Sequence, residues 1–136
     1  MCLLNSVLTW DQITIQCDAV SHRSATNPLR AHGRLGSVCG IEYAAQAMAI
    51  HGALLAPMDS AIPRIGYLVS VRGTTLHVAH LENITTDLLI KADCITASAN
   101  NILYDFNVST CGQLLLAGRA TVVLNATSPF ILGESV

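Results

Sequence analysis

The sequence contains few charged and few aromatic residues. Charged residues make up 12% of its 136 residues and aromatic residues 4%, whereas apolar residues make up 51%. Ordinary soluble domains are roughly 25% charged, so this chain has too few charges to cover the whole surface of a monomer. Much of that surface should lie in an interface, and we expect an oligomer.

Long apolar runs and basic clusters are also missing. A membrane-spanning helix needs about 20 consecutive apolar residues, but the best run, Ala44 to Met58, is interrupted by Gln46 and His51. The first residues, MCLLNSVLTWDQ, have no basic stretch before an apolar one and no cleavage motif, unlike a signal peptide. The seven Lys and Arg residues are scattered, which argues against nucleic-acid binding. We expect a cytoplasmic protein without membrane insertion.

The cysteines follow no pattern typical of a disulfide framework or a metal site. Their number is odd, and no two are spaced as C-x-x-C: Cys2, Cys17, Cys39, Cys94 and Cys111. We therefore expect the cysteines to act as small apolar side chains in the core, and we expect no bound metal.

Hydrophobic periodicity predicts one α+β domain over residues 1–136. Alternation of apolar and polar residues is typical of strands, and a run rich in Asn, Pro and Gly is typical of a loop. The expected order is strands at Cys2–Trp10 and Gln12–Val20, a loop at Ser21–Gly36, a helix at Val38–Leu55, strands at Gly66–Arg72 and Thr74–Leu81 (or one bent strand), and an antiparallel meander at Thr86–Thr96, Ile102–Val108 and Leu114–Leu124.

The predicted helix is apolar almost all the way round. Its segment, GSVCGIEYAAQAMAIHGALLAP, places Glu42 in the first turn and Gln46 four residues later on the same face. A helix that apolar needs cover on every side. We therefore expect a single sheet curled round this helix, with its inner face buried against it.

Order and residues together resemble the hotdog fold, specifically the 3-hydroxyacyl-acyl-carrier-protein dehydratases and their thioesterase relatives. GIEYAAQAMAIHGALL is similar to the family's central helix, whose acid-x-x-x-Gln pattern is met by Glu42 and Gln46. GYLVSVRGTTLHVAHL resembles its third strand, and ILYDFNVSTCGQLLLAGRATVVL its closing hairpin. More narrowly, NPLRAHGRLGSVCGIEYAAQAMA resembles dehydratase-like proteins of aryl polyene biosynthesis.

The resemblance implies a homodimer or heterodimer whose sheets join edge to edge. Each active site would pair the helix-borne acid of one subunit with a histidine of the other. The substrate would be an acyl thioester of fatty acid or polyene biosynthesis, delivered by acyl carrier protein on its phosphopantetheine arm, so that the chain needs no cofactor of its own.

The sequence departs from the family in the histidine. The His-Phe-Pro-Gly turn that precedes the family's helix is missing, and its position falls near Pro28. A shortened loop would bring His32 into the role, and His22 is the other candidate. Both histidines could equally be ordinary loop residues.

Dehydration needs a base for the α-proton, an acid for the departing hydroxyl and donors for the thioester oxygen. Glu42, in an apolar pocket, would be the acid, because desolvation favours a protonated carboxyl; His32 or His22 would be the base. We expect the substrate-binding residues at the same mouth: Cys39 and Gly40 through backbone N–H groups, Gln46 beside Glu42, and Arg34 toward the phosphate or the carrier.

Each assignment has an alternative. The helix dipole alone favours a glutamate in a first turn, and Arg34 could be a solvated loop residue. At the level of function, a thioesterase would use the same acid to activate water. A non-catalytic partner would lend only half a site to a complete dehydratase.

Overall fold

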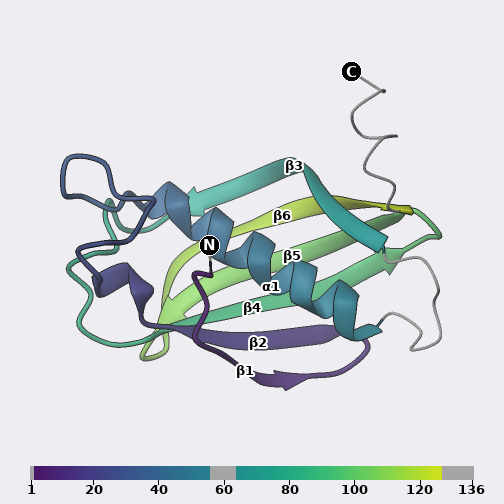
Figure 1. The fold of residues 1–136 in the computed structure, drawn as a ribbon, viewed down its shortest axis with the longest axis horizontal. Helices are drawn as coiled ribbons and strands as arrows, with labels where there is room; N and C mark the ends of the chain where they lie inside the picture. Colours follow the sequence, from purple (N-terminus) through teal and green to yellow (C-terminus); the bar gives the residue numbers. More distant parts are fainter. Residues whose placement is uncertain (1, 56–63, 127–136) are drawn as a thin grey trace.

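The computed structural model describes residues 2–55 and 64–126, which form one antiparallel sheet and one long helix. The elements are β1 (Ser6–Trp10), β2 (Thr14–Ala19), α1 (Gly40–Leu55), β3 (Arg64–Leu76), β4 (Leu88–Ala97), β5 (Asn101–Thr110) and β6 (Gln113–Ala126), with 3₁₀ turns at Ser21–Arg23 and Ser37–Cys39. In Figure 1, α1 lies across one face of the curved sheet. The predicted α+β arrangement is confirmed.

The strands are ordered β1-β2-β4-β5-β6-β3, so β1 and β3 form the two edges of the sheet. The predicted meander is confirmed as β4, β5 and β6, with Cys111 and Gly112 in the turn between the last two. Of the two possibilities for the segment after the helix, one bent strand is correct. It is β3, whose register against β6 shifts between Arg72 and Thr75, where Gly73 has a φ of +60°.

The inner face of the sheet is buried beneath α1 and supplies most of the core. Alternate residues of β2, β4, β5 and β6 point inward, as the sequence pattern predicts: Ile15, Cys17, Ala19, Leu88, Ile90, Ala92, Ile102, Tyr104, Phe106, Val108, Leu116, Ala120 and Val122. Ile13 was expected to join them but is 62% exposed. It lies in the turn before β2 begins, so it does not follow the strand's alternation.

Among the described residues, the sheet covers one side of helix α1, which corrects the prediction of cover all round. Its buried side presents Tyr43, Ala44, Ala47, Met48 and His51 to the sheet. Its other side carries exposed residues, all but one of them apolar: Glu42, Ala49, Ala53, Leu54 and Leu55. A single sheet curls round one side of a helix, so a second chain would be needed to cover the rest.

Within the described residues, the segment Ser37–Leu55, with a mean hydropathy of 1.2, is long and apolar enough to cross a membrane by length and composition alone. About a third of this segment is buried within the protein.

His51 is a core residue that fixes the far end of α1. Its Nε2 donates to the carbonyl oxygen of Asp11 at 2.7 Å, and its Nδ1 lies 2.7 Å from the hydroxyl of Tyr104. Because a carbonyl can only accept, Nε2 carries the hydrogen and Nδ1 accepts from the tyrosine. Burial raises the pKa of Tyr104, which keeps its hydroxyl protonated for this bond.

Candidate active site at the start of the central helix

Glu42 lies in the first turn of α1, on the exposed side of the helix. Within residues 2–55 and 64–126, its carboxylate has no hydrogen-bond or ion-pair partner. The predicted apolar pocket around this acid is therefore not formed by a single chain, because the sheet covers the opposite side of α1. The carboxylate is open to substrate or to a second subunit.

Cys39 lies just before α1, close to Glu42 in the sequence. Its half-buried thiol is 3.9 Å from the carbonyl oxygen of Leu29. Burial raises the pKa of the Cys39 thiol, and the negative charge of Glu42 raises it further. Because the thiolate is the reactive form, the raised pKa keeps the Cys39 thiol in its less reactive, protonated state.

The backbone N–H groups of Cys39 and Gly40 are occupied by the 3₁₀ turn that precedes α1. The N–H of Cys39 donates to the carbonyl of Gly36 at 3.0 Å, and that of Gly40 points to the carbonyls of Ser37 and Val38. Both amides therefore make hydrogen bonds within the chain, and their binding of a thioester oxygen stays a prediction. The positive end of the helix dipole still favours negative charge at this place.

Gly40 is required for packing between the helix and the sheet. A Cβ built on it would lie 2.6 Å from Cδ2 of the fully buried Leu116 on β6. The sheet therefore approaches α1 closely at Gly40.

Gln46 fixes the N-terminal segment to the helix. Its Oε1 accepts a hydrogen bond from the backbone N–H of Leu3 at 2.8 Å. This contact gives Gln46 a structural role between α1 and the segment before β1, and its role toward a substrate stays a prediction.

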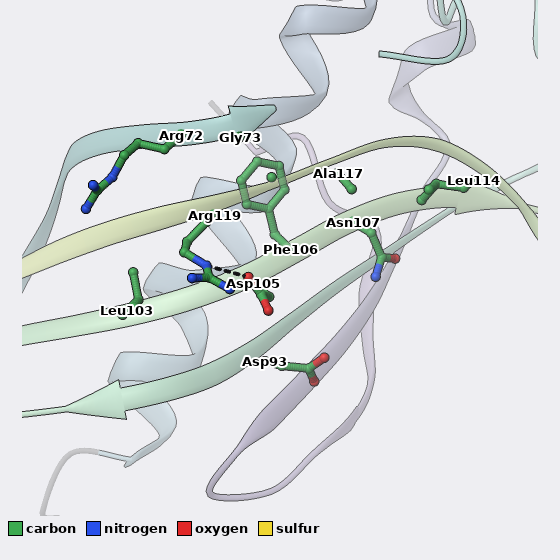
Figure 2. Close-up of a pocket in the computed structure, with 11 residues that line it drawn as sticks. Arg72, Gly73, Asp93, Leu103, Asp105, Phe106, Asn107, Leu114, Ala117 and Arg119 are labelled. Carbon is green, nitrogen blue, oxygen red and sulfur yellow. Dashed lines mark hydrogen bonds and ion pairs between the residues drawn. The ribbon is translucent and has the colours of Figure 1, made fainter. Parts of the chain in front are cut away.

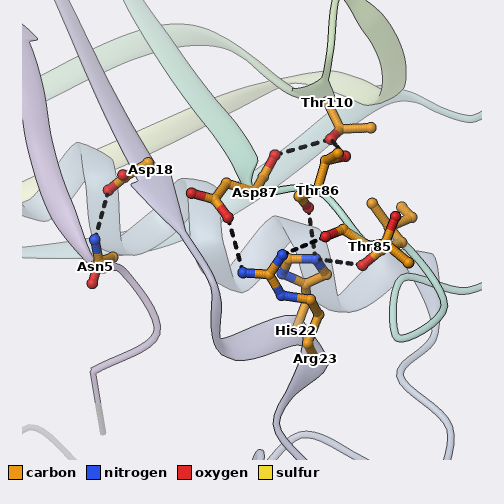
Figure 3. Close-up of polar contacts among 9 residues, drawn as sticks. Asn5, Asp18, His22, Arg23, Thr85, Thr86, Asp87 and Thr110 are labelled. Carbon is orange, nitrogen blue, oxygen red and sulfur yellow. Dashed lines mark hydrogen bonds and ion pairs between the residues drawn. The ribbon is translucent and has the colours of Figure 1, made fainter.

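His22 is fully buried in the 3₁₀ turn Ser21–Arg23. Its Nε2 lies 3.1 Å from the carbonyl oxygens of both Ile84 and Thr86, so Nε2 must carry the hydrogen. Nδ1 is buried and, among the residues that the structure describes, has no hydrogen-bond partner. Figure 3 shows the imidazole beside the loop of Thr85 and Thr86. Burial lowers the pKa of His22, and this neutral, enclosed ring is a structural histidine.

His32 has the opposite environment. It is exposed at the tip of a two-residue turn in which Ala31 and Arg34 exchange both backbone hydrogen bonds, at 2.9 and 3.0 Å. His32 has a φ of +54° and Gly33 one of +76°, the combination that a type I′ turn requires. Of the two candidate histidines, His32 alone presents its ring to the outside.

Arg34 forms an ion pair with Glu82, in the loop between β3 and β4. Its Nε donates to Oε2 of Glu82 at 2.6 Å, and Oε1 of Glu82 accepts the N–H of Leu35 at 2.7 Å. The side chain of Arg34 remains 52% exposed, so a role toward the carrier stays a prediction. Sequence reasoning missed Glu82, because nothing in HLENITTD marks one carboxylate as buried.

A second missed group anchors the loop to α1. The hydroxyl of Tyr43 lies 2.7 Å from Oγ of Ser21, and it accepts a hydrogen bond from Nδ2 of Asn27 at 3.0 Å. The hydroxyl of Ser21 in turn donates to the carbonyl oxygen of Leu3. Burial raises the pKa of Tyr43. Tyr43 was predicted only as an apolar helix residue, since its hydroxyl contacts are set by the folded loop.

A hollow of about 730 Å³ lies on the sheet, away from these residues. Figure 2 shows that Arg72, Asp93, Asp105 and Arg119 extend along its surface, with Phe106 between the strands. Arg119 and Asp105 form an ion pair at 3.0 Å. None of the predicted site residues lines this hollow. Among the described residues, no group of three or more His, Cys, Asp or Glu is placed to hold a metal ion.

Comparison with solved structures identifies the fold. A chain of the dehydratase heterocomplex ApeI:P from Xenorhabdus doucetiae has a TM-score of 0.80 at 20% identity, with 99% of this chain and 90% of that chain covered. A mutant of the thioesterase PA1618 from Pseudomonas aeruginosa has a TM-score of 0.66 at 12% identity, with 89% and 81% covered. These likenesses establish the hotdog fold. No curated protein matches the sequence.

The family comparison covers almost the whole chain. Residues 1–130 match the ApeP-like family, described as ApeP dehydratase, and this confirms the resemblance found in the helix and the loop before it. The chain is a hotdog-fold protein that belongs to the ApeP-like dehydratase family.

Proposed function

We propose that the chain is one subunit of a cytoplasmic 3-hydroxyacyl-acyl-carrier-protein dehydratase of fatty acid or aryl polyene biosynthesis, and that a second hotdog subunit completes its site. The observation that carries this proposal is the exposed Glu42 at the start of α1, which has no hydrogen-bond or ion-pair partner among the described residues, in a chain of the ApeP-like family.

The edge strand β3 supports the need for a second subunit. It is 13 residues long and unpaired along one side, with Val69 56% and Leu76 49% exposed. A long apolar edge readily accepts another strand. The neighbour from Xenorhabdus doucetiae is itself a dehydratase heterocomplex, so the second subunit is either another copy of this chain or a different hotdog protein.

In the proposed reaction, the imidazole of His32 from one subunit removes a proton from C2 of the 3-hydroxyacyl thioester. The carboxyl group of Glu42 from the other subunit protonates the hydroxyl on C3, which leaves as water. The electron pair of the broken C–H bond forms the C2–C3 double bond, so the products are an enoyl thioester and water. The dipole at the start of α1 favours the negative charge that develops on the thioester oxygen.

The test uses a 3-hydroxyacyl thioester on acyl carrier protein, added to the purified chain alone and together with a second hotdog dehydratase subunit. We expect an enoyl product by mass spectrometry, and Glu42→Gln should lower kcat on the order of 10²- to 10⁴-fold. Asp87→Asn, which changes an exposed carboxylate on the far side of the loop, is the matched control.

Three other outcomes would contradict the proposal. Free acid as the product would indicate a thioesterase. Turnover that needs the second subunit but survives Glu42→Gln would indicate a non-catalytic partner. No product from either mixture would exclude this substrate class.

A further inference from the structure

Glu82 is a nearly buried carboxylate in the loop between β3 and β4. Only 7% of its side chain is exposed, and a buried charge persists only where it is paired and hydrogen-bonded. Both oxygens have partners: Oε1 accepts the N–H of Leu35 at 2.7 Å and Oε2 accepts Nε of Arg34 at 2.6 Å. Nδ1 of His80 lies 3.8 Å from Oε1.

These contacts keep Glu82 ionised. Desolvation alone would raise the pKa of this carboxyl group, but the hydrogen bonds from Leu35 and Arg34 outweigh it and lower the pKa to about 2. At neutral pH the carboxylate is therefore a fixed negative charge that binds the two residues leading out of the His32 turn.

The turn itself has little other support. It is an isolated bridge between Ala31 and Arg34 and does not continue into strands, and short hairpins are marginally stable alone. A non-glycine residue with positive φ, such as His32, adds backbone strain to the turn. On the other flank, NH1 of Arg30 donates to the carbonyl of Gly33 at 3.0 Å.

We propose that Glu82 is a positioning residue for His32. By binding the side chain of Arg34 and the backbone of Leu35, it fixes the exit of the turn to the loop that follows β3. The same loop is joined to this segment by backbone hydrogen bonds from Leu81 to Leu35 and from Ser37 to Ala79. This inference rests on the proposed function, because the position of His32 matters to turnover only if its ring is the base.

The test compares Glu82→Gln with the wild type. The amide oxygen can still accept the N–H of Leu35, but the negative charge for Arg34 is lost. A misplacement of about 1 Å at a reacting group lowers the rate on the order of a hundredfold, so we expect kcat to fall by about ten- to a hundredfold while KM stays within about twofold.

Asp87→Asn is the matched control, because Asp87 forms the corresponding ion pair with Arg23 at 2.9 Å on the same loop (Figure 3). It should leave kcat unchanged. In Arg34→Gln, kcat should fall as in Glu82→Gln, and the double variant should lose no more than either single one, since residues acting through one contact are not additive. An unchanged kcat in Glu82→Gln, or additive losses in the double variant, would overturn the positioning role.

An NMR measurement of the His32 ring, which does not depend on enzymatic activity, tests this inference separately from the proposed function. The imidazole signals of His32 in NMR spectra should shift and broaden in Glu82→Gln and in Arg34→Gln, but not in Asp87→Asn. If these signals shift and broaden in a chain that makes no enoyl product under any condition, the positioning of His32 by Glu82 is supported and the dehydratase proposal fails. If they do not move, Glu82 does not position His32, whatever the activity.

Discussion

His22 and His32 belong to the same loop, and the fold gives them opposite environments. His22 is fully buried, and its ring donates to the carbonyls of Ile84 and Thr86. His32 is exposed on a turn with positive φ, and within the described residues its ring has no hydrogen-bond partner. The first histidine stabilises the loop, whereas the second is displayed by it.

The comparison teaches that the role of a loop histidine is decided by the backbone around it. Carbonyls that leave a strand or a turn need donors when they are buried, and His22 meets that need at the residues before β4. At the His32 turn, the backbone groups of Ala31 and Arg34 satisfy each other. Within the described residues the imidazole there makes no hydrogen bond that holds the fold, which supports the proposal that it acts as the base.

The largest effect should come from His32→Asn. Asparagine tolerates positive φ, so the turn and the free energy of unfolding should change by less than about 0.5 kcal/mol. Loss of a general base should lower kcat on the order of 10²- to 10⁴-fold. Steady-state kinetics and chemical denaturation measure the two quantities. His22→Gln is the control: its amide can donate to the same carbonyls, and kcat should persist. The assignment of the base would be reversed if His22→Gln lost activity and His32→Asn kept it.

The sequence was sufficient for the fold because the signals were periodic and local. Alternation in β4, β5 and β6, turn residues such as Cys111-Gly112, and an apolar helix with a glutamate in its first turn each indicate one structure. Errors occurred at boundaries: Ile13 precedes its strand, and α1 begins at Gly40, after a 3₁₀ turn.

The site was less predictable because its contacts join distant segments. Nothing near Glu82 in the sequence indicates that it binds Arg34, since that pair depends on how two loops meet. Choosing His32 over His22 as the candidate base required knowledge of the burial and hydrogen bonds of each ring. The sequence distance of each histidine from Glu42 does not give that information. The exposure of Glu42 likewise depends on which side of α1 the sheet covers.

A smaller effect, on stability, should separate the same two histidines. His22→Ala removes a buried ring and leaves the carbonyls of Ile84 and Thr86 without their donor, which should lower the free energy of unfolding by about 2–3 kcal/mol. His32→Ala should lower it by less than about 0.5 kcal/mol. Urea denaturation at pH 7 measures both. Equal losses would mean that the two environments do not differ as the hydrogen bonds indicate.

The smallest effect should appear in the pH dependence of stability. Burial lowers the pKa of His22 below its ordinary value of 6.5, although its backbone hydrogen bonds and Asp87 act in the other direction; nearby Arg23 adds to the lowering. Between the folded and unfolded pKa, the unfolded chain binds a proton that the folded chain does not. Stability must therefore fall as the pH drops below about 6.5, and the loss must stop below the folded pKa.

His22→Gln removes this titration while keeping a donor for both carbonyls. Because His51 and the exposed histidines are present in both proteins, their contributions cancel in the difference between wild type and variant. That difference in unfolding free energy should be constant above about pH 7.5 and should shift against the wild type as the pH falls below about 6.5. An Asp87→Asn background should steepen the change, since Asp87 is the carboxylate that favours the charged ring. Parallel curves over the whole range would show that His22 takes up protons equally well folded and unfolded, and would remove the contrast with His32.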